Sequence, residues 1–310
     1  MMWLAFVVSI VTIAIGAATS VLYAALGEVI SERAGVINLG VEGTMLIGAA
    51  VSVAIAALTG NPYLGVLVAL VAGGLFNSIF AFLVITRRAN QLASGLTLGF
   101  LGIGLSALIG RPTVGRLVKG LPEWPVPGLS ALPARVPALE DAVFRYDLLV
   151  YLVVPLAILL TWLLYRTRWG LALRTVGEDR TVAYAAGLKL ARLQYQAVFI
   201  GGMLAAVGGA QLALGFTSGW TEQMTSGRGF IAVALVIFAA WSPLRAVLGA
   251  LLFGGALALQ IQLQVNGAPI SPFLLEMLPY LLTLGVLLAW RKQPGYTMPA
   301  GLSSVFEGMR

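Results

Sequence analysis

The chain has 310 residues, of which 59% are apolar and only 10% are charged, and its formal net charge is +7. A soluble domain carries roughly 25% charged residues, so this composition excludes an ordinary soluble globular protein and indicates a membrane protein. In a membrane protein, the excess of basic residues fits cytoplasmic loops and contact with anionic lipid better than nucleic-acid binding.

Long stretches without charge alternate with short charged segments along the chain. Because a helix needs about 20 apolar residues to cross the bilayer core, these stretches predict nine membrane spans. The seventh is short, and a tenth span is possible if a broken helix is counted as two. The expected fold is therefore all-α and polytopic, with one transmembrane domain over residues 1–310. The expected spans cover residues 3–26, 41–58, 63–85, 91–110, 147–165, 194–214, 229–241, 246–263 and 273–290.

The placement of Lys and Arg predicts the orientation, because positively charged loops stay in the cytoplasm. With the N-terminus outside, thirteen of the 19 basic residues lie inside and six, Arg228 among them, lie outside. This orientation makes residues 111–147 an external loop and residues 166–193 a cytoplasmic segment, and it places the C-terminus in the cytoplasm.

Charged and polar residues separate two apolar runs in the segment GEVISERAGVINLGVEG, residues 27–43. With the N-terminus outside, Glu28, Glu32 and Arg33 fall in a cytoplasmic turn, where the opposite charges can pair or be solvated. Glu42 falls inside the second span, where a charge costs roughly 2.5–3.5 kcal/mol on insertion scales. We expect Glu42 to face a cavity, contact a partner or bind a proton, in either a gating or a purely structural role. Irregular backbone here is tolerated if protein buries it or it lines water.

Two segments suggest an internal repeat: NPYLGVLVALVAGG (61–74) and SPLRAVLGALLFGG (242–255) are identical at seven positions when aligned on their prolines. In the nine-span topology Pro62 lies outside and Pro243 inside, so the second span corresponds to the seventh with the membrane inverted. Chance similarity between alanine- and leucine-rich helices is the alternative. A genuine repeat predicts the inverted-topology architecture of transporters, with broken helices near the midplane. Small residues would allow close helix packing, namely Gly201, Gly202, Ala205, Gly208, Gly209, Gly254 and Gly255.

Catalytic and metal-binding residue types are scarce. The chain has no His and no Cys, so it lacks the imidazole and thiolate groups of most general bases and zinc sites. It also lacks the G-x-x-x-x-G-K-[ST] phosphate loop, so it does not bind ATP through that motif. We expect no catalytic residue, no metal site and no cofactor on this chain, and a protein that is not itself an enzyme.

The longest polar stretch on the predicted cytoplasmic side is RTRWGLALRTVGEDRTVAYAAGLKLARLQYQ, residues 166–196. Its centre, residues 177–187, begins with a Gly-Glu-Asp cluster suited to a helix N-terminus and ends with a glycine suited to a C′ position. The segment predicts a short helix on which a partner ATPase docks, and an ordinary solvated loop is the alternative. The expected coupling residues are Gly177, Glu178, Asp179, Ala183, Ala186 and Gly187.

Polar side chains within the expected spans are candidates for a substrate path. They are mostly neutral, which suits an uncharged polyhydroxyl or base-bearing solute better than an ion. Such groups also hydrogen-bond helix to helix, which is the alternative for each of them. The candidates are Asn38, Glu42, Gln91, Ser94, Thr97, Gln211 and Gln260.

Three long stretches of the chain resemble the membrane permeases of bacterial ABC importers, in the branched-chain amino acid and simple-sugar permease family. They are GEVISERAGVINLGVEGTMLIGA, RTVGEDRTVAYAAGLKLARLQYQAVFIGGMLAAVGGAQLALG and MTSGRGFIAVALVIFAAWSPLRAVLGALLFGGALALQIQLQ. The combination of E-R-x-G-V-x-N-L-G-x-E-G with G-R-G-F-I-A-x-A-L-x-I-F is most similar to the nucleoside and purine-riboside subgroup. Relatives often carry Gly where Ala239 or Ala240 stands.

The resemblance implies a permease subunit in the bacterial cytoplasmic (inner) membrane that forms the path for nucleosides by alternating access. It also implies ATP-binding subunits that hold ATP and Mg²⁺, a second permease that is a relative or a copy of this chain, and an extracytoplasmic substrate-binding protein. Membrane lipid is an expected contact and nucleic acid is not. The alternatives are a sugar or branched-chain amino acid ABC permease, or a secondary transporter working alone, whose ion site would need Glu42 or Glu276.

Overall fold

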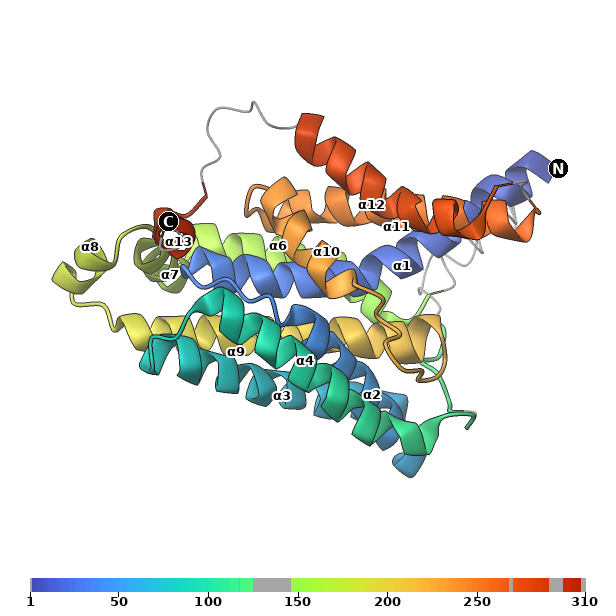
Figure 1. Cartoon of the computed structure of the whole chain (residues 1–310), viewed down its shortest axis with the longest axis horizontal. Coiled ribbons are helices and arrows are strands. Elements are labelled where there is room, and N and C mark those ends of the chain that lie inside the picture. The colour runs from blue at the N-terminus through green and yellow to red at the C-terminus, as the bar shows by residue number, and fades with distance from the viewer. Residues whose placement is uncertain (1, 117, 125–145, 268–269, 290–297, 308–310) are drawn as a thin grey trace.

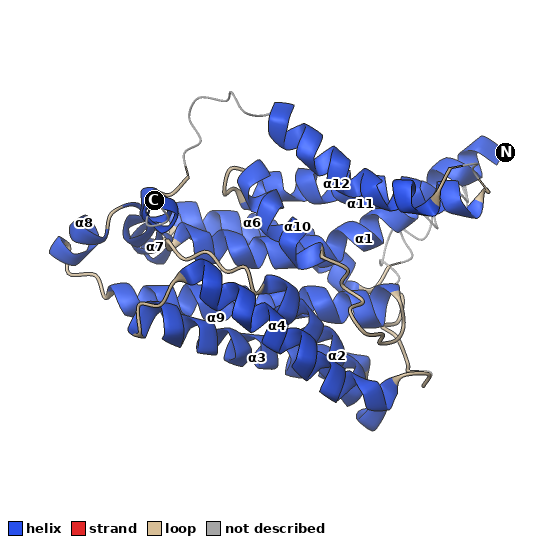
Figure 2. Ribbon diagram, in the orientation of Figure 1, coloured by secondary structure: helices blue, strands red, loops and turns tan. Residues whose placement is uncertain are grey.

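The computed structural model describes residues 2–116, 118–124, 146–267, 270–289 and 298–307. These residues form a bundle of helices (Figures 1 and 2), and in this part of the chain the only β-type pairing is an isolated bridge between Glu123 and Asp147. The all-α expectation is confirmed. The elements are α1 (Met2–Arg33), α2 (Val41–Thr59), α3 (Pro62–Ala81), η1 (Phe82–Thr86), α4 (Gln91–Gly110), η2 (Arg111–Thr113), α6 (Leu148–Arg166), α7 (Arg168–Glu178), α8 (Arg180–Ala185), α9 (Leu190–Gln211), η4 (Leu212–Phe216), α10 (Arg228–Phe238), α11 (Pro243–Val265), α12 (Pro272–Ala289) and α13 (Ala300–Glu307).

Nine of these helices correspond to the expected spans. Within the described residues, seven helical segments are long and apolar enough to cross a membrane, and α10 and part of α12 are shorter apolar helices. The largest shift is in α1, which continues to Arg33 rather than ending at residue 26. At 11 residues, α10 is about 16 Å long, which is too short for a hydrocarbon core of about 30 Å. It is an interrupted helix rather than a full span.

The core of the bundle lies along α1, α2 and α9. In the most apolar 18-residue stretch of each helical segment, 72% of the residues are buried in α2 and 78% in the segment that begins with α9. The corresponding shares are only 28% in the segment that begins with α4 and 33% in α6. The outward faces of α4 and α6 carry large apolar side chains such as Phe100 and Trp162. Those faces suit contact with lipid or with another membrane-embedded chain.

Glycines set how closely the core helices approach. A Cβ on Gly201 would meet the Ser31 hydroxyl of α1, and a Cβ on Gly209 would meet the carbonyl oxygen of Met45 in α2. The expected role of small residues in close packing is confirmed at these positions. It is wrong for Gly255, because an added Cβ there would meet nothing within 4 Å.

The bundle has two distinct ends in Figure 1. Helices α7, α8 and α13 lie together at one end, and the N-terminus lies at the other. The first turns of α2 and α10 meet inside the bundle, where a Cβ on Gly229 would collide with the backbone of Glu42. From that point the two helices run toward opposite ends (Figure 1), a geometry that agrees with the predicted inverted repeat.

Candidate functional site

The carboxylate of Glu42 lies where the N-termini of α2 and α10 meet. Its Oε1 accepts hydrogen bonds from the Thr225 hydroxyl (2.6 Å) and the Gly227 N–H (2.8 Å), and its Oε2 accepts one from the Gly229 N–H (2.6 Å). Glu42 is only 6% exposed and Thr225 is fully buried. Of the three expected surroundings for Glu42, the structure shows contact with a partner, and that partner is the start of α10.

The loop before α10 is shaped to present these donors. Gly227 has φ +81°, a left-handed conformation that glycine adopts without the steric cost of a side chain. The Tyr280 hydroxyl of α12 donates to the Ser226 carbonyl (2.8 Å) and fixes the loop from the other side. Arg228, the first residue of α10, lies over the Phe216 ring at 5.8 Å from its centroid.

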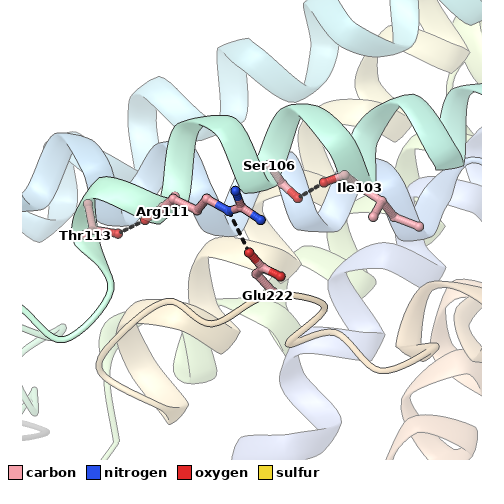
Figure 3. Close-up of polar contacts among 6 residues, drawn as sticks. Ile103, Ser106, Arg111, Thr113 and Glu222 are labelled. Carbon is pink, nitrogen blue, oxygen red and sulfur yellow. Dashed lines mark hydrogen bonds and ion pairs between the residues drawn. The ribbon is translucent and has the colours of Figure 1, made fainter.

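The same loop is tied to the end of α4 at the surface. Arg111 Nε and Glu222 Oε1 form an ion pair at 2.8 Å, shown in Figure 3 beside the turn where Thr113 donates to the Gly110 carbonyl. Both charged side chains are more than half exposed. An exposed pair of this kind contributes about 0–1 kcal/mol, so it guides the loop rather than anchoring it.

The turn after α10 is held by the end of α1. Trp241 Nε1 donates to Glu32 Oε2 at 2.5 Å, and Arg33 Nε donates to the Trp241 carbonyl at 3.0 Å. Arg33 also donates to the Tyr165 hydroxyl at 3.0 Å. Because Glu42 binds the other end of α10, this short helix is held at both ends by residues 32–42, a single continuous stretch of the chain.

The charged residues at the end of α1 differ from the expectation. They lie in the last two turns of a helix and not in a solvated turn, and neither carboxylate bonds to Arg33. Glu28 is 2% exposed and its Oε1 accepts from the Asn38 N–H (2.7 Å), while Glu32 is fully buried against Trp241. The expectation was wrong because α1 continues into the bundle, where backbone and indole N–H groups replace water as donors.

The non-helical segment between α1 and α2, residues 34–40, is almost entirely buried. Side chains satisfy its backbone: Gln91 Oε1 accepts from the Ile37 N–H (2.9 Å), and Gln194 Nε2 donates to the Ala34 carbonyl (3.1 Å). Asn38 Oδ1 accepts from the Gly40 N–H (2.8 Å). This is irregular backbone buried by protein, which is the condition under which a membrane tolerates it.

Other candidate path residues lie apart from this site. Thr97 is exposed and Ser94 half-buried on the outer side of α4, and Gln260 is half-buried in α11. The Gln211 side-chain amide is buried and donates to Asp147 Oδ2 at 3.5 Å. Only Asn38, Glu42 and Gln91 come together, around residues 34–42.

The predicted helix at residues 177–187 is divided at Asp179. Gly177 and Glu178 end α7, and Asp179 caps α8 by accepting from the Thr181 and Val182 N–H groups. Hydrogen bonds from the Thr181 hydroxyl and these N–H groups hold the pKa of Asp179 below its ordinary value. Ala186 is the C-cap of α8 and Gly187 follows with φ +74°. The expected helix boundary at Gly187 is confirmed, whereas the start is two to three residues later than expected.

Gly177 lies at a three-way junction. It is buried against the Arg33 carbonyl of α1, and a Cβ on Gly301 of α13 would lie 2.6 Å from the Gly177 carbonyl oxygen. Glu178 Oε2 accepts a hydrogen bond at 3.1 Å from the N–H of Ala300, which is the first residue of α13. The α7–α8 segment therefore contacts both the end of α1 and the C-terminal helix.

Sequence reasoning missed Thr225, Gly227, Trp241 and Gln194. The motif G-R-G-F-I-A carried a signal for Gly227, because a glycine-rich helix start supplies backbone N–H donors for an anion. No feature of the sequence indicated that the anion would be Glu42. Within the part of the chain that the structure describes, no group of acidic side chains could hold a metal ion.

A helical bundle with a short interrupted helix, buried irregular backbone and outward apolar faces is the architecture of a multi-pass membrane protein, and interrupted helices are common in transporters. The family described as "Branched-chain amino acid transport system / permease component" matches residues 9–288. The chain belongs to this family and is an ABC transporter permease subunit.

Relatives that match most of the chain include three named as ABC transporter permease proteins. TsgC13 of Haloferax volcanii, provisionally named a glucose ABC transporter permease protein, is 39% identical over 92% of this chain and 92% of its own length. The guanosine ABC transporter permease protein NupQ of Bacillus subtilis is 33% identical over 86% and 87%. The nucleoside ABC transporter permease protein NupC of Lactococcus lactis is 33% identical over 87% and 88%.

Proposed function

We propose that this permease imports nucleosides, driven by ATP hydrolysis on separate ATP-binding subunits. Support for the solute comes from two relatives named for guanosine and nucleoside transport, each 33% identical to this chain. A sugar is the second candidate, favoured by the 39% identity to TsgC13. Both are uncharged polyhydroxyl solutes, which fits the mostly neutral polar side chains predicted for the path.

The observation that carries the ATP-driven mechanism is the exposed surface of α8. This helix lies at the extreme end of the bundle (Figure 1) and exposes Val182 by 55% and Tyr184 by 76%, while Ala183 between them is fully buried. Large apolar side chains on a polar projection suit a protein partner. The partner in this proposal is the ATP-binding subunit, and residues 166–193 are the cytoplasmic coupling segment.

The proposed orientation follows from that assignment. If α8 is cytoplasmic, then the N-terminus, at the other end of the bundle (Figure 1), lies outside, and the described start of the predicted external loop, residues 111–116 and 118–124, lies on the same outer side. Residues 125–145 of that loop fall outside the described residues. The inner membrane of a bacterium is the proposed location, and an extracytoplasmic binding protein would deliver the solute to the outer end.

A second permease completes the proposed path. Ser94 and Thr97 lie on the outer side of α4, where a lipid contact would give them no role in transport. A relative or copy of this chain packed against α4 would bring both side chains into an interface. The path would then run between the two permeases, with ATP and Mg²⁺ bound only on the other subunits.

Co-purification in mild detergent, followed by mass spectrometry and uptake assays in cells that lack endogenous nucleoside transport, tests the proposal. We expect an ATP-binding subunit and a second permease to copurify, and labelled guanosine uptake to be competed by nucleosides and not by glucose. Competition by glucose alone would favour the sugar alternative. A chain recovered alone that transports without ATP would contradict the mechanism.

A further inference from the structure

A wide cavity lies at the end of the bundle that carries α8 (Figure 1). It has a volume of about 620 Å³ and is lined by Arg180 of α8, the end of η1, and the first residues of α4 and α9. Arg88 and Arg180 are the charged residues of this lining. Neither forms an ion pair or a hydrogen bond with the described residues. The lining therefore presents two unpaired guanidinium groups and no acidic side chain.

Arg88 reaches the cavity from a strained turn. Its φ is +55°, a left-handed conformation that costs free energy for a residue with a side chain and that glycine adopts freely. The turn closes η1, because the Ala89 N–H donates to the Leu83 carbonyl at 3.0 Å. Helix ends of this kind usually carry glycine at the left-handed position, so the turn itself does not require an arginine. Strained residues of this kind cluster at ligand sites.

A buried amide in the same lining indicates that the ligand carries a hydrogen-bond donor. Gln194 is 5% exposed, and its Nε2 donates to the Ala34 carbonyl at 3.1 Å. Its Oε1 accepts no hydrogen bond from the described residues, and a buried acceptor without a partner is costly. An ionised phosphate has only acceptors and would not satisfy this oxygen. A hydroxyl attached to the phosphate would.

The cavity lies at the depth of lipid headgroups. Its lining includes the ends of three segments that are long and apolar enough to cross a membrane, Pro62–Thr86, Gln91–Thr113 and Leu190–Phe216. The ends of such spans lie at the polar surface of the bilayer. A headgroup at this depth can enter the cavity while its acyl chains remain in the hydrocarbon core.

An exposed apolar stripe on α3 leads to the cavity. Its members recur every three or four residues, so they share one face of the helix. They are Leu67, Val71, Leu75, Ile79 and Phe82, each between 47% and 60% exposed. The stripe ends just before Val84 and Ile85, which line the cavity. An acyl chain can therefore lie along α3 with its headgroup in the cavity.

We propose that this cavity binds an anionic phospholipid whose headgroup carries hydroxyl groups, as phosphatidylglycerol does. Arg88 and Arg180 hold its phosphate, because the planar guanidinium matches phosphate geometry. Gln194 Oε1 accepts a headgroup hydroxyl, and an acyl chain covers the stripe on α3. A choline headgroup fits neither feature, because it brings a positive charge to two arginines and has no hydroxyl. The bound lipid joins α8 to the turn before α4.

The test measures lipid binding to the delipidated full-length chain in a neutral detergent. Dioleoyl phosphatidylglycerol should raise the melting temperature Tm saturably, by about 2–4 °C. Native mass spectrometry should detect one retained molecule of this lipid per chain. Dioleoyl phosphatidylcholine, with the same acyl chains, should do neither. Equal Tm shifts with the two lipids would overturn the proposal.

Arg88→Asn tests the site directly. Asparagine tolerates the left-handed backbone, so the Tm without lipid should match or exceed that of the wild type. Half of the shift should need about tenfold more phosphatidylglycerol, as expected for the loss of a hydrogen bond to a charged group. Arg180→Gln changes a different element and should weaken binding to a similar degree. Arg87→Asn is the matched control, because it removes the same charge from a neighbouring exposed residue outside the lining. Equal affinities of Arg87→Asn and Arg88→Asn would refute a specific site.

Two further ligands separate the parts of the proposal. Phosphatidylethanol has the phosphate and charge of phosphatidylglycerol without a headgroup hydroxyl, so half of its Tm shift should need a several-fold higher concentration. Equal affinity would contradict the hydroxyl contact at Gln194. Inorganic phosphate at the same concentration should leave Tm unchanged. A shift as large as that with the lipid would identify a soluble anion as the occupant and overturn the lipid assignment.

An acidic side chain of the ATP-binding subunit is the competing occupant. In that case Arg88→Asn would lose the subunit on copurification and bind phosphatidylglycerol as the wild type does, a result that would overturn the proposal. The lipid measurements do not rest on the proposed function. A wild-type protein that binds the lipid as expected and transports no nucleoside would contradict only the proposed function.

Discussion

Replacement of Ala183 by proline tests whether α8 couples the permease to its ATPase. The Ala183 N–H donates to the Asp179 carbonyl at 3.0 Å, so proline removes a hydrogen bond and its ring clashes with that carbonyl. The cost in a helix interior is about 3 kcal/mol, which corresponds to roughly a hundredfold change in the helix population. A helix of six residues has little stability of its own and cannot absorb that cost.

The spans should be unaffected, because α8 is joined to them through α7 and the start of α9 rather than packed among them. We expect Ala183→Pro to reach the membrane in normal amount, to lose the ATP-binding subunit on affinity purification, and to abolish nucleoside uptake. The assays are the ratio of copurified ATP-binding subunit to permease and the initial rate of labelled uptake.

Arg180→Pro is the matched control. Arg180 is the first residue of α8 and follows Asp179, which has the extended backbone that precedes a proline, with φ −147° and ψ 113°. Proline is favoured at this first helical position, so the helix should persist. Arg180→Ala reports the loss of the side chain alone. Normal retention of the ATP-binding subunit and normal uptake by Ala183→Pro would refute the coupling role of α8.

Three further predictions follow from the site and the topology. Glu42→Gln should lower the free energy of unfolding by about 2 kcal/mol while the fold persists, because an amide NH₂ would face an N–H donor; unchanged Tm and uptake would contradict this. Ala240 has φ +50°, so Ala240→Gly should stabilise the protein by about 1 kcal/mol, seen as a higher Tm, and a lower Tm would refute the strain. A single Cys at Lys119 should react with impermeant maleimide in intact spheroplasts, and one at Arg180 only after lysis; the reverse pattern would invert the orientation.

The strain at Ala240 could not be read from the sequence. A methyl group is harmless at a loop end unless the backbone needs a positive φ. The structure shows positive φ at both Ala240 and Trp241 (φ +56°), where the chain turns sharply and the Trp241 indole bonds to Glu32. A substitution can be seen in the sequence, but the dihedral angle that makes it costly depends on the tertiary contact.

Hydropathy alone identified the membrane class and all nine membrane-associated helices, because the length and polarity of an apolar run are local properties. A local signal also marked one helix end, because Gly187 follows α8 in the left-handed conformation that its position suggested. The sequence also indicated that Glu42 must face a cavity, contact a partner or bind a proton, since a lone carboxylate is costly inside a span.

Only the tertiary structure decided which group each carboxylate bonds to. Glu42 bonds to an N–H group 185 residues away in the chain, and Glu32 bonds to an indole 209 residues away. Every residue except proline carries a backbone N–H, so a sequence does not mark which of them will be left without a partner at a helix start. Helix packing determines that choice, and here it placed the two ends of α10 against one charged stretch of the chain.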